Sequence, residues 1–236
     1  MRAARDDGSA VRTFVGAGVD VASTSMGTRL VVVQHGEKLG GPGDPALTAL
    51  GRDQAEQTAT WVAERFSPVG VWTSPLRRAV ETATPLSAAI GVEISIDERL
   101  RERMNWEGEQ HLALDDFFAE WRVATDDRSY VPRCGDSSEQ AAARFIDAIT
   151  DLTDLLPADA TIAVVAHGGV TVDTLRTIAG DEYIQASRPD LLTDGVPCGA
   201  LTVLERTGIT WQVMQLPSAA HLVEPVQRSA RRSTHD

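Results

Sequence analysis

Residues 29–36 read RLVVVQHG, and this stretch does most to decide the fold. Its branched apolar side chains follow one another without alternation, which is typical of a strand buried on both faces of a sheet. A histidine and a glycine end the run, and a glycine-rich loop at residues 39–44 follows them. The stretch therefore predicts a buried strand that places His35 at its C-terminal end.

The same pattern occurs a second time at residues 164–169, which read VVAHGG. In open α/β sheets ligands bind beyond the carboxyl ends of the strands, and a glycine there lets the backbone approach a ligand closely. One such histidine by itself is more often structural than catalytic. Two of them in the same context lead us to expect that His35 and His167 face one site. The remaining histidines have no comparable context and are assigned no function: His111, His221 and His235.

Strand and helix patterns alternate along the rest of the chain. Branched apolar runs predict further strands at residues 69–73, 92–96, 161–166, 200–204 and 210–215. Apolar residues spaced three and four apart predict helices that begin after Thr48, at Ser74-Pro75, at Glu139 and after His167. We interpret Ser74 and Pro75 as the N-cap and first residue of the second of these helices. This order predicts an α/β fold, a three-layer αβα sandwich with a mostly parallel central sheet.

The composition is that of an ordinary globular protein, with 236 residues of which 42% are hydrophobic and 24% charged. We expect one sizeable domain over residues 26–222, between a disordered extension at 1–25 and a flexible tail at 223–236. Met26 is an alternative start of the chain. No apolar stretch has the length needed to span a bilayer, so we expect no membrane partner.

Charge and cysteine content bear on the partners of the protein. The net charge of −12 argues against a nucleic-acid partner, because no basic stripe is available to neutralise backbone phosphates. A small phosphorylated substrate remains compatible with it, since a pocket needs only a few local cations. The two cysteines, Cys134 and Cys198, form no disulfide framework and no metal motif. We expect reduced thiols in a cytoplasmic protein.

Two adjacent arginines stand at a third junction of strand and helix, in residues 73–82, which read TSPLRRAVET. An arginine in the first turn of a helix opposes the helix dipole, which is unusual unless an anion is bound there. A helical side chain leans toward the N-terminus of its helix, so such an arginine reaches back over the strand end. We assign this role to Arg78 and interpret Arg77 as solvated.

Four landmarks, in one order, resemble those of the histidine phosphatase (phosphoglycerate mutase-like) superfamily over residues 29–215. Residues 34–37, QHGE, are similar to the family's Arg-His-Gly-Glu signature. Residues 47–55, LTALGRDQA, resemble its LTxxGxxQA helix. Residues 74–83, SPLRRAVETA, resemble its SxLxRAxxTA segment, and residues 167–169, HGG, match its second histidine.

The resemblance implies a phosphoglycerate mutase-like fold with a cap segment at residues 103–138. It implies that His35 attacks phosphorus and becomes a phosphohistidine, while Arg78 and His167 hold the phosphoryl oxygens. No metal or other cofactor is implied, since a neutral imidazole is a workable nucleophile near neutral pH. Gln34, Gly36 and Gly168 are the further substrate-binding residues that the matched motifs imply.

The family's proton donor lies after the third strand, where this chain has residues 100–103, LRER. Glu102 is therefore the candidate general acid for the leaving oxygen and then the base for water. The segment is also a solvated charge run, and it offers three other carboxylates, Glu98, Glu107 and Glu109.

Gln34 stands where the family has arginine, and it brings neither a charge nor a five-donor fork. Losing one donor to transition-state charge typically costs about 10²–10³ in rate. Three interpretations remain. The first is a slow or specialised phosphatase with a compensating cation, and the second is a non-catalytic relative that binds a phosphorylated ligand or protein. The third is an enzyme whose substrate oxygens are arranged so that the amide of Gln34 is preferred to an arginine. We favour the first, because the other catalytic positions are retained. The candidate compensating cations are Lys38, Arg52 and Arg77.

Two other activities are less favoured. Mutases of the family carry a serine and an asparagine shortly after the signature glutamate, whereas residues 38–43 here read KLGGPG. A metal site could draw its ligands from His35, Glu37, His167 and Asp173, but their spacing is not that of a ligand motif, and the arginine would repel a cation.

The cap segment holds a large share of the aromatic side chains of the chain. These are accompanied by one methionine, and the set is Met104, Trp106, Phe117, Phe118, Trp121 and Tyr130. They form either a small core beneath a long connection or an apolar wall for an organic leaving group. The second interpretation favours an organic phosphomonoester, so the expected partner is a small phosphorylated metabolite. The oligomeric state is left open by the sequence.

Overall fold

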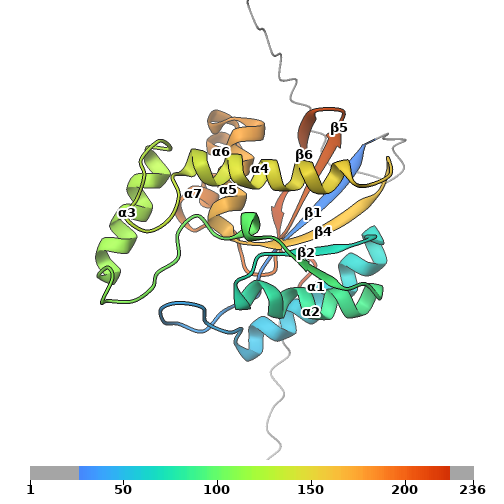
Figure 1. Cartoon of the computed structure of the whole chain (residues 1–236), viewed down its shortest axis with the longest axis horizontal. Helices are drawn as coiled ribbons and strands as arrows, with labels where there is room; N and C mark the ends of the chain where they lie inside the picture. The colour runs from blue at the N-terminus through green and yellow to red at the C-terminus, as the bar shows by residue number, and fades with distance from the viewer. Residues whose placement is uncertain (1–26, 224–236) are drawn as a thin grey trace, which may run out of the picture.

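A computed structural model describes residues 27–223, and its centre is one six-stranded sheet (Figure 1). The strand order is β3-β2-β4-β1-β5-β6, in which the first four strands are parallel and β5 and β6 are antiparallel. The strands are β1 (Thr28–Gln34), β2 (Val71–Thr73), β3 (Ile94–Ile96), β4 (Thr161–Ala166), β5 (Leu201–Thr207) and β6 (Thr210–Ser218). The predicted extension at 1–25 and nearly all of the predicted tail lie outside the described residues.

Helices cover both faces of this sheet, so the predicted three-layer sandwich is confirmed. The helices are α1 (Ala49–Phe66), α2 (Arg77–Ile90), a 3₁₀ turn η1 (Glu98–Leu100), α3 (Leu114–Asp126), α4 (Ser138–Asp154), α5 (Gly168–Ala179), α6 (Asp181–Ser187) and α7 (Asp190–Thr193). Helices α1 and α2 pack on one face, and α4 and α5 pack on the other. Among the described residues, no helix combines the length and hydrophobicity that a bilayer crossing requires.

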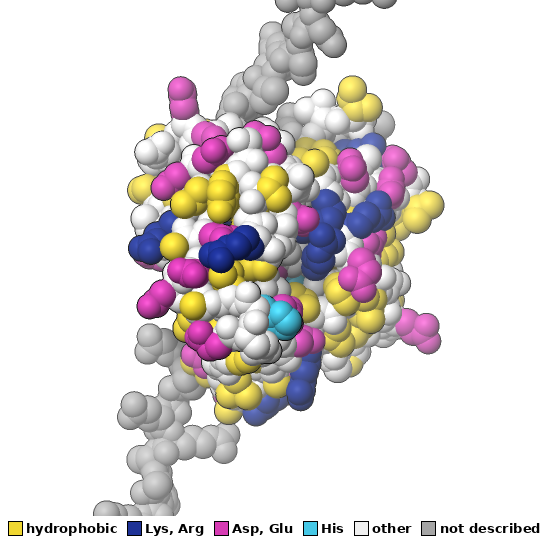
Figure 2. Space-filling model, turned by 60° about the vertical axis from the view of Figure 1, so that its left-hand side comes forward, with side chains coloured by type: hydrophobic (Ala, Val, Ile, Leu, Met, Phe, Trp, Pro, Cys, Tyr) yellow, Lys and Arg dark blue, Asp and Glu magenta, His cyan; other side chains and the backbone are white. Residues whose placement is uncertain are grey.

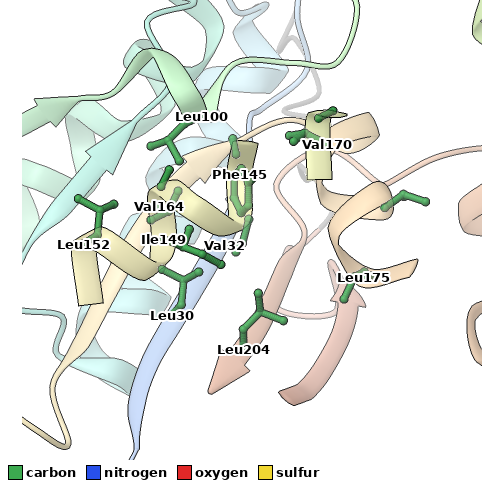
Figure 3. Close-up of a cluster of buried hydrophobic side chains, with 14 of the residues drawn as sticks. Leu30, Val32, Leu100, Phe145, Ile149, Leu152, Val164, Val170, Leu175 and Leu204 are labelled. Carbon is green, nitrogen blue, oxygen red and sulfur yellow. The ribbon is translucent and has the colours of Figure 1, made fainter. Parts of the chain in front are cut away.

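The apolar run of β1 is buried on both sides, which explains its lack of alternation. Val31 and Val33 belong to the core cluster formed with α1 and α2. Leu30 and Val32 face the opposite cluster, where Phe145 of α4 packs against the sheet (Figure 3). Because successive side chains of a strand point to opposite faces, a strand at the middle of a sandwich needs apolar residues at every position.

The start of α2 corrects the prediction for Ser74. The helix begins at Arg77, its N-cap is Leu76, and no side chain caps it. The Ser74 hydroxyl instead accepts a bond from the Leu76 N–H at 3.3 Å and lies 2.7 Å from Nε2 of His167. The N-cap interpretation was wrong, because Ser74 lies three residues before the helix begins. Its hydroxyl contacts His167, which follows a strand distant in the sequence.

The cap segment between η1 and α4 folds beside the sandwich, with α3 set apart from the sheet (Figure 1). Met104, Leu112 and Phe117 form a small core of their own, against which Trp106 and Trp121 pack. The first interpretation of the cap segment, a small core, is therefore confirmed for Met104, Trp106, Phe117 and Trp121, but not for Phe118 and Tyr130.

Candidate active site

A cavity of about 810 Å³ opens between the carboxyl ends of the strands and the cap. It is lined by three residues that were predicted from separate segments of the sequence: His35, Arg78 and Glu102. Lys38 and Asn105 also lie on its wall. The cap contributes an apolar side made of Met104, Trp106, Leu114, Phe117, Phe118 and Trp121. Figure 2 shows this side of the molecule, where basic and hydrophobic side chains gather around a hollow.

His35 is held as a neutral imidazole with one nitrogen free. Its side chain follows directly on β1 and is buried, and Nδ1 lies 2.8 Å from the carbonyl oxygen of Gly36. A carbonyl only accepts hydrogen bonds, so Nδ1 carries the proton and Nε2 keeps its lone pair. Burial lowers the pKa of His35 to about 4; the hydrogen bond to Gly36 opposes this shift, and the positive charges of Arg78 and Lys38 contribute to it. At neutral pH this nitrogen is therefore available as a nucleophile.

Gly36 fixes the backbone that carries this histidine. Its N–H donates to the Thr82 hydroxyl at 3.0 Å. A Cβ at this position would lie 2.3 Å from the carbonyl oxygen of Gly51 in α1, so no larger residue fits there. Gly36 is not on the cavity wall, and the contact with substrate predicted for it stays a prediction.

His167 lies behind His35, without exposure to solvent. The two ring centroids are 5.3 Å apart. Nε2 of His167 is hydrogen-bonded to Ser74, whereas Nδ1 has no partner among residues 27–223. Burial, together with the nearby charges, lowers the pKa of His167 well below its usual range. The structure thus brings the two predicted histidines together, with His35 toward the cavity.

Arg78 presents unused hydrogen-bond donors beside His35. It is 4% exposed, and its Nη2 donates to Oδ1 of Asn105 at 3.3 Å. Nη1 is 3.8 Å from a carboxylate oxygen of Asp44, while Nε and Nη1 have no hydrogen-bond partner within the described part of the chain. A buried guanidinium with free donors suits a phosphoryl group, which it can bind through two oxygens. Arg77, by contrast, has a side chain that is 60% exposed and paired with Glu81, as predicted.

Asn105 is a site residue that sequence reasoning missed. It accepts from Arg78 and donates to the carbonyl oxygen of Gly43 at 2.9 Å, so it links the arginine to the glycine-rich loop. Gly43 in turn donates to the carbonyl oxygen of Trp106 at 2.7 Å. No sequence pattern marked Asn105, because its partners come from two distant segments.

Glu102 is oriented by three backbone N–H groups. Its carboxylate accepts from Arg103 at 2.7 Å, from Val170 at 2.8 Å and from Gly169 at 3.0 Å. The last two belong to the first turn of α5, where the helix dipole favours a negative charge. Of the carboxylates considered in this charge run, Glu102 is the one on the cavity wall, which supports its assignment.

Gln34 points away from the cavity that His35 lines. Its buried side chain lines a second cavity of about 230 Å³, which also contains Gly168. Glu102 lies on the wall of both cavities. Oε1 of Gln34 has no hydrogen-bond partner among the described residues. The amide therefore lines a cavity that Glu102 also lines and that Arg78 does not.

A buried ion pair ties the Glu102 segment to α5. Arg103 donates to Asp173 at 3.0 Å and to Thr125 at 3.0 Å, and its guanidinium lies 4.2 Å from the centroid of a Trp121 ring. Asp173 also accepts from Ser138 at 2.7 Å. Burial raises the pKa of Asp173 to about 6.

These contacts bear on the metal-site alternative. Asp173 is used by Arg103, and Glu37 accepts a hydrogen bond from Thr48 at 2.5 Å. Within residues 27–223 no three His, Cys, Asp or Glu side chains are arranged to hold a metal ion. The two carboxylates considered for a metal site thus have protein partners of their own.

A mostly parallel sheet with a histidine, a buried arginine and a glutamate on one cavity at its strand ends is the arrangement expected of an α/β protein that handles phosphoryl groups. The chain belongs to the histidine phosphatase superfamily (branch 1), whose sequence profile matches residues 25–217. The resemblance inferred from the four landmarks is thereby confirmed.

Curated relatives indicate the kind of activity. A glucosyl-3-phosphoglycerate phosphatase of Mycolicibacterium vanbaalenii is 34% identical over 168 residues, which are 64% of this chain and 74% of that protein. A protein of the same name from Mycobacterium tuberculosis H37Rv is 32% identical over 159 residues, which are 60% of this chain and 71% of that protein. Phosphomonoester hydrolysis, the predicted class of activity, is confirmed by these relatives.

Solved structures agree with this assignment. Mycobacterial glucosyl-3-phosphoglycerate phosphatase in complex with inorganic phosphate superposes with a TM-score of 0.66 at 25% identity, over 83% of this chain and 99% of that one. The complex of that enzyme with VO3 gives a TM-score of 0.63 at 28% identity, over 78% of this chain and 96% of that one. The predicted phosphoglycerate mutase-like architecture is confirmed.

Proposed function

We propose that this phosphatase hydrolyses a small organic phosphomonoester through a phosphohistidine on His35. One observation carries the proposal: a neutral imidazole with a free Nε2 lines the same cavity as a buried guanidinium with unused donors. Phosphoryl transfer depends on in-line positioning and charge stabilisation, which these two groups supply.

Glu102 begins the cycle in its protonated form. Nε2 of His35 attacks phosphorus, the ester P–O bond breaks, and Glu102 gives its proton to the leaving alkoxide. Water then attacks the phosphohistidine, its proton passes to Glu102, and the P–N bond breaks to release phosphate. Arg78 holds the phosphoryl oxygens throughout, and the same role predicted for His167 would use its unpartnered Nδ1, because its Nε2 is bound by Ser74.

The cavity indicates the size and nature of the leaving group. About 810 Å³ is within the range of ordinary small-molecule sites, and the cap gives one side of it an apolar surface. The relatives bear the name glucosyl-3-phosphoglycerate phosphatase. We therefore place phosphorylated sugar acids and other organic monoesters first among candidate substrates. The slow or specialised character inferred from Gln34 belongs to this proposal, as does a cytoplasmic location, which the free thiols of Cys134 and Cys198 support.

The test is phosphate release from a panel of phosphomonoesters, with a chelator present. Wild type and His35→Ala are compared, and Arg65→Ala, a change outside the cavity, serves as the control. We expect turnover of at least one monoester by wild type and by the control, and none by His35→Ala. Turnover that persists unchanged in His35→Ala would overturn the mechanism. Binding of phosphate without turnover of any monoester would favour the non-catalytic alternative, which the phosphatase relatives do not favour.

A further inference from the structure

Lys38 is the single lysine of the chain, since every other member of its combined count of 22 Lys and Arg residues is an arginine. It stands three residues after His35, and it lines the same cavity as His35 and Arg78. The only lysine side chain of the molecule therefore lies at the candidate phosphate site.

The backbone of Lys38 is fixed on both sides. Lys38 forms an isolated antiparallel bridge with Leu47, and the next N–H, that of Leu39, donates to the carbonyl oxygen of Ala46 at 2.9 Å. On the other side, the N–H of Glu37 donates to Gln54 of α1 at 2.8 Å. The glycines that follow make the loop adaptable, but the lysine itself is anchored at the edge of the cavity.

No ion pair within residues 27–223 uses this ammonium. Burial, and then the positive charge of Arg78, lower the pKa of Lys38. Both charges also lower the pKa of His35. Two cations therefore lie beside a neutral histidine, and the one ion pair that either of them makes within the described residues is the 3.8 Å contact of Arg78 with Asp44. Glu102 also lines the cavity, but three backbone N–H groups bind its carboxylate. The two cations form a pocket suited to a multiply charged anion.

The other candidate compensating cations are used elsewhere. Arg52 donates to the carbonyl oxygen of Leu47 at 2.9 Å. Arg77 is mostly exposed and bonded to Glu81 at 2.7 Å. Neither lines the cavity, and Gln34 faces the second cavity.

We propose that Lys38 binds the phosphoryl group together with Arg78, supplying the second positive charge that Gln34 does not bring. The assignment rests on the proposed function, because it names a residue for the same site. A lysine acts there as a mobile point charge, while the arginine provides the geometric fork. In this arrangement the arginine that the family carries before its histidine is absent, and Lys38 reaches into the cavity from its edge instead.

The first test uses the uniqueness of the lysine. Pyridoxal 5′-phosphate carries a phosphate and an aldehyde, so it condenses with a nearby amine, and borohydride then reduces the imine to a stable amine. Peptide mass spectrometry locates the adduct. We expect labelling of Lys38 that saturating inorganic phosphate suppresses, while labelling of the N-terminal α-amine, the internal control, is unchanged. Equal labelling of Lys38 with and without phosphate would overturn the proposal.

The second test measures the Kd of inorganic phosphate by calorimetry. We expect Lys38→Met to raise Kd about tenfold or more, in line with the loss of one charge-assisted bond. Lys38→Arg keeps the charge and should stay within about threefold of wild type on the same ground. Arg77→Met, the matched control, should leave Kd unchanged. A Kd for Lys38→Met equal to that for Arg77→Met would contradict the assignment.

These tests separate the two proposals. If turnover depends on His35 but the phosphate Kd ignores Lys38, the Lys38 assignment alone is overturned. If Lys38 is protected by phosphate but no monoester is hydrolysed, the proposed function is overturned and the Lys38 assignment is supported.

Discussion

The ends of β1 and β4 carry nearly the same sequence, a run of valines and then histidine and glycine, yet they end in different environments. His35 stands on the cavity wall with Nε2 free. His167 is completely buried, with Nε2 bound by Ser74. Gly36 packs against α1. Gly168 is the first residue of α5, and N–H groups in the first turn of this helix donate hydrogen bonds to Glu102.

The difference suggests how, under the proposed mechanism, the surroundings of each histidine determine its role. Each strand ends in a histidine at the same edge of the sheet. The hydrogen bonds of each imidazole then set its proposed role, because Nε2 is free in His35 and bound by Ser74 in His167. The end of β1 supplies the proposed nucleophile. The end of β4 supplies a supporting ring and, through α5, the support for the proposed proton donor.

The largest expected effect is at the end of β1. His35→Ala should lower kcat by at least about 10³-fold, because the nucleophile has no substitute. His167→Ala leaves the nucleophile in place, so its loss should be smaller. Single-turnover rates with an aryl phosphate measure both. Equal losses of activity in the two variants would contradict the different roles assigned to the two strand ends.

The next effect concerns the support of α5. Asp173→Asn leaves the Arg103 charge buried without its partner, so we expect the free energy of unfolding to fall by about 3 kcal/mol. Urea denaturation measures it. Asp190→Asn breaks an exposed pair with Arg188 and should leave the free energy of unfolding nearly unchanged. The same cost for both variants would contradict the role given to the buried pair.

A smaller effect is expected at the contact that distinguishes His167. Ser74→Ala removes the partner of Nε2 and should lower kcat about tenfold, as loss of an orienting partner commonly does. KM should change little, since Ser74 is not on the cavity wall. A change in KM with kcat unaltered would indicate that Ser74 touches the substrate instead.

The last effect is confined to acidic pH: it is the pH dependence of stability contributed by His35. Its folded pKa of about 4 lies below the unfolded value of 6.5, so the unfolded chain binds more protons between these values. Acidification from pH 6.5 to 4 therefore lowers the stability, by at most about 1.4 kcal/mol per pH unit for this one group. Denaturation of His35→Gln over that range should show a shallower loss than wild type. Parallel curves would contradict the buried, neutral state.

The sequence was sufficient for those features that depend on local pattern. The unbroken apolar run of β1, the cap of α1 at Thr48 and the position of Arg78 in the first turn of α2 were all predicted and found. The direction of Gln34 could also have been predicted, because neighbouring residues of a strand point to opposite faces.

Other features depend on contacts between distant segments. Ser74 fits an N-cap pattern, but its partner is 93 residues away along the chain. Asn105 bonds with Arg78 and with Gly43, which no local pattern relates to it. Lys38 was one of several candidate cations until the fold placed the others outside the cavity.

The central claim is that the end of β1, and not the end of β4, carries the phosphoryl group. Trapping of the intermediate tests it most directly: the enzyme is mixed with an aryl phosphate, quenched in alkali, which preserves phosphohistidine, and digested with trypsin. Cleavage after Arg29 and Lys38 places His35 in residues 30–38, whereas His167 falls in residues 145–176. We expect the phosphoryl group on the first peptide only. Phosphate on the second peptide, or rapid turnover with no phosphohistidine on the first, would contradict the account.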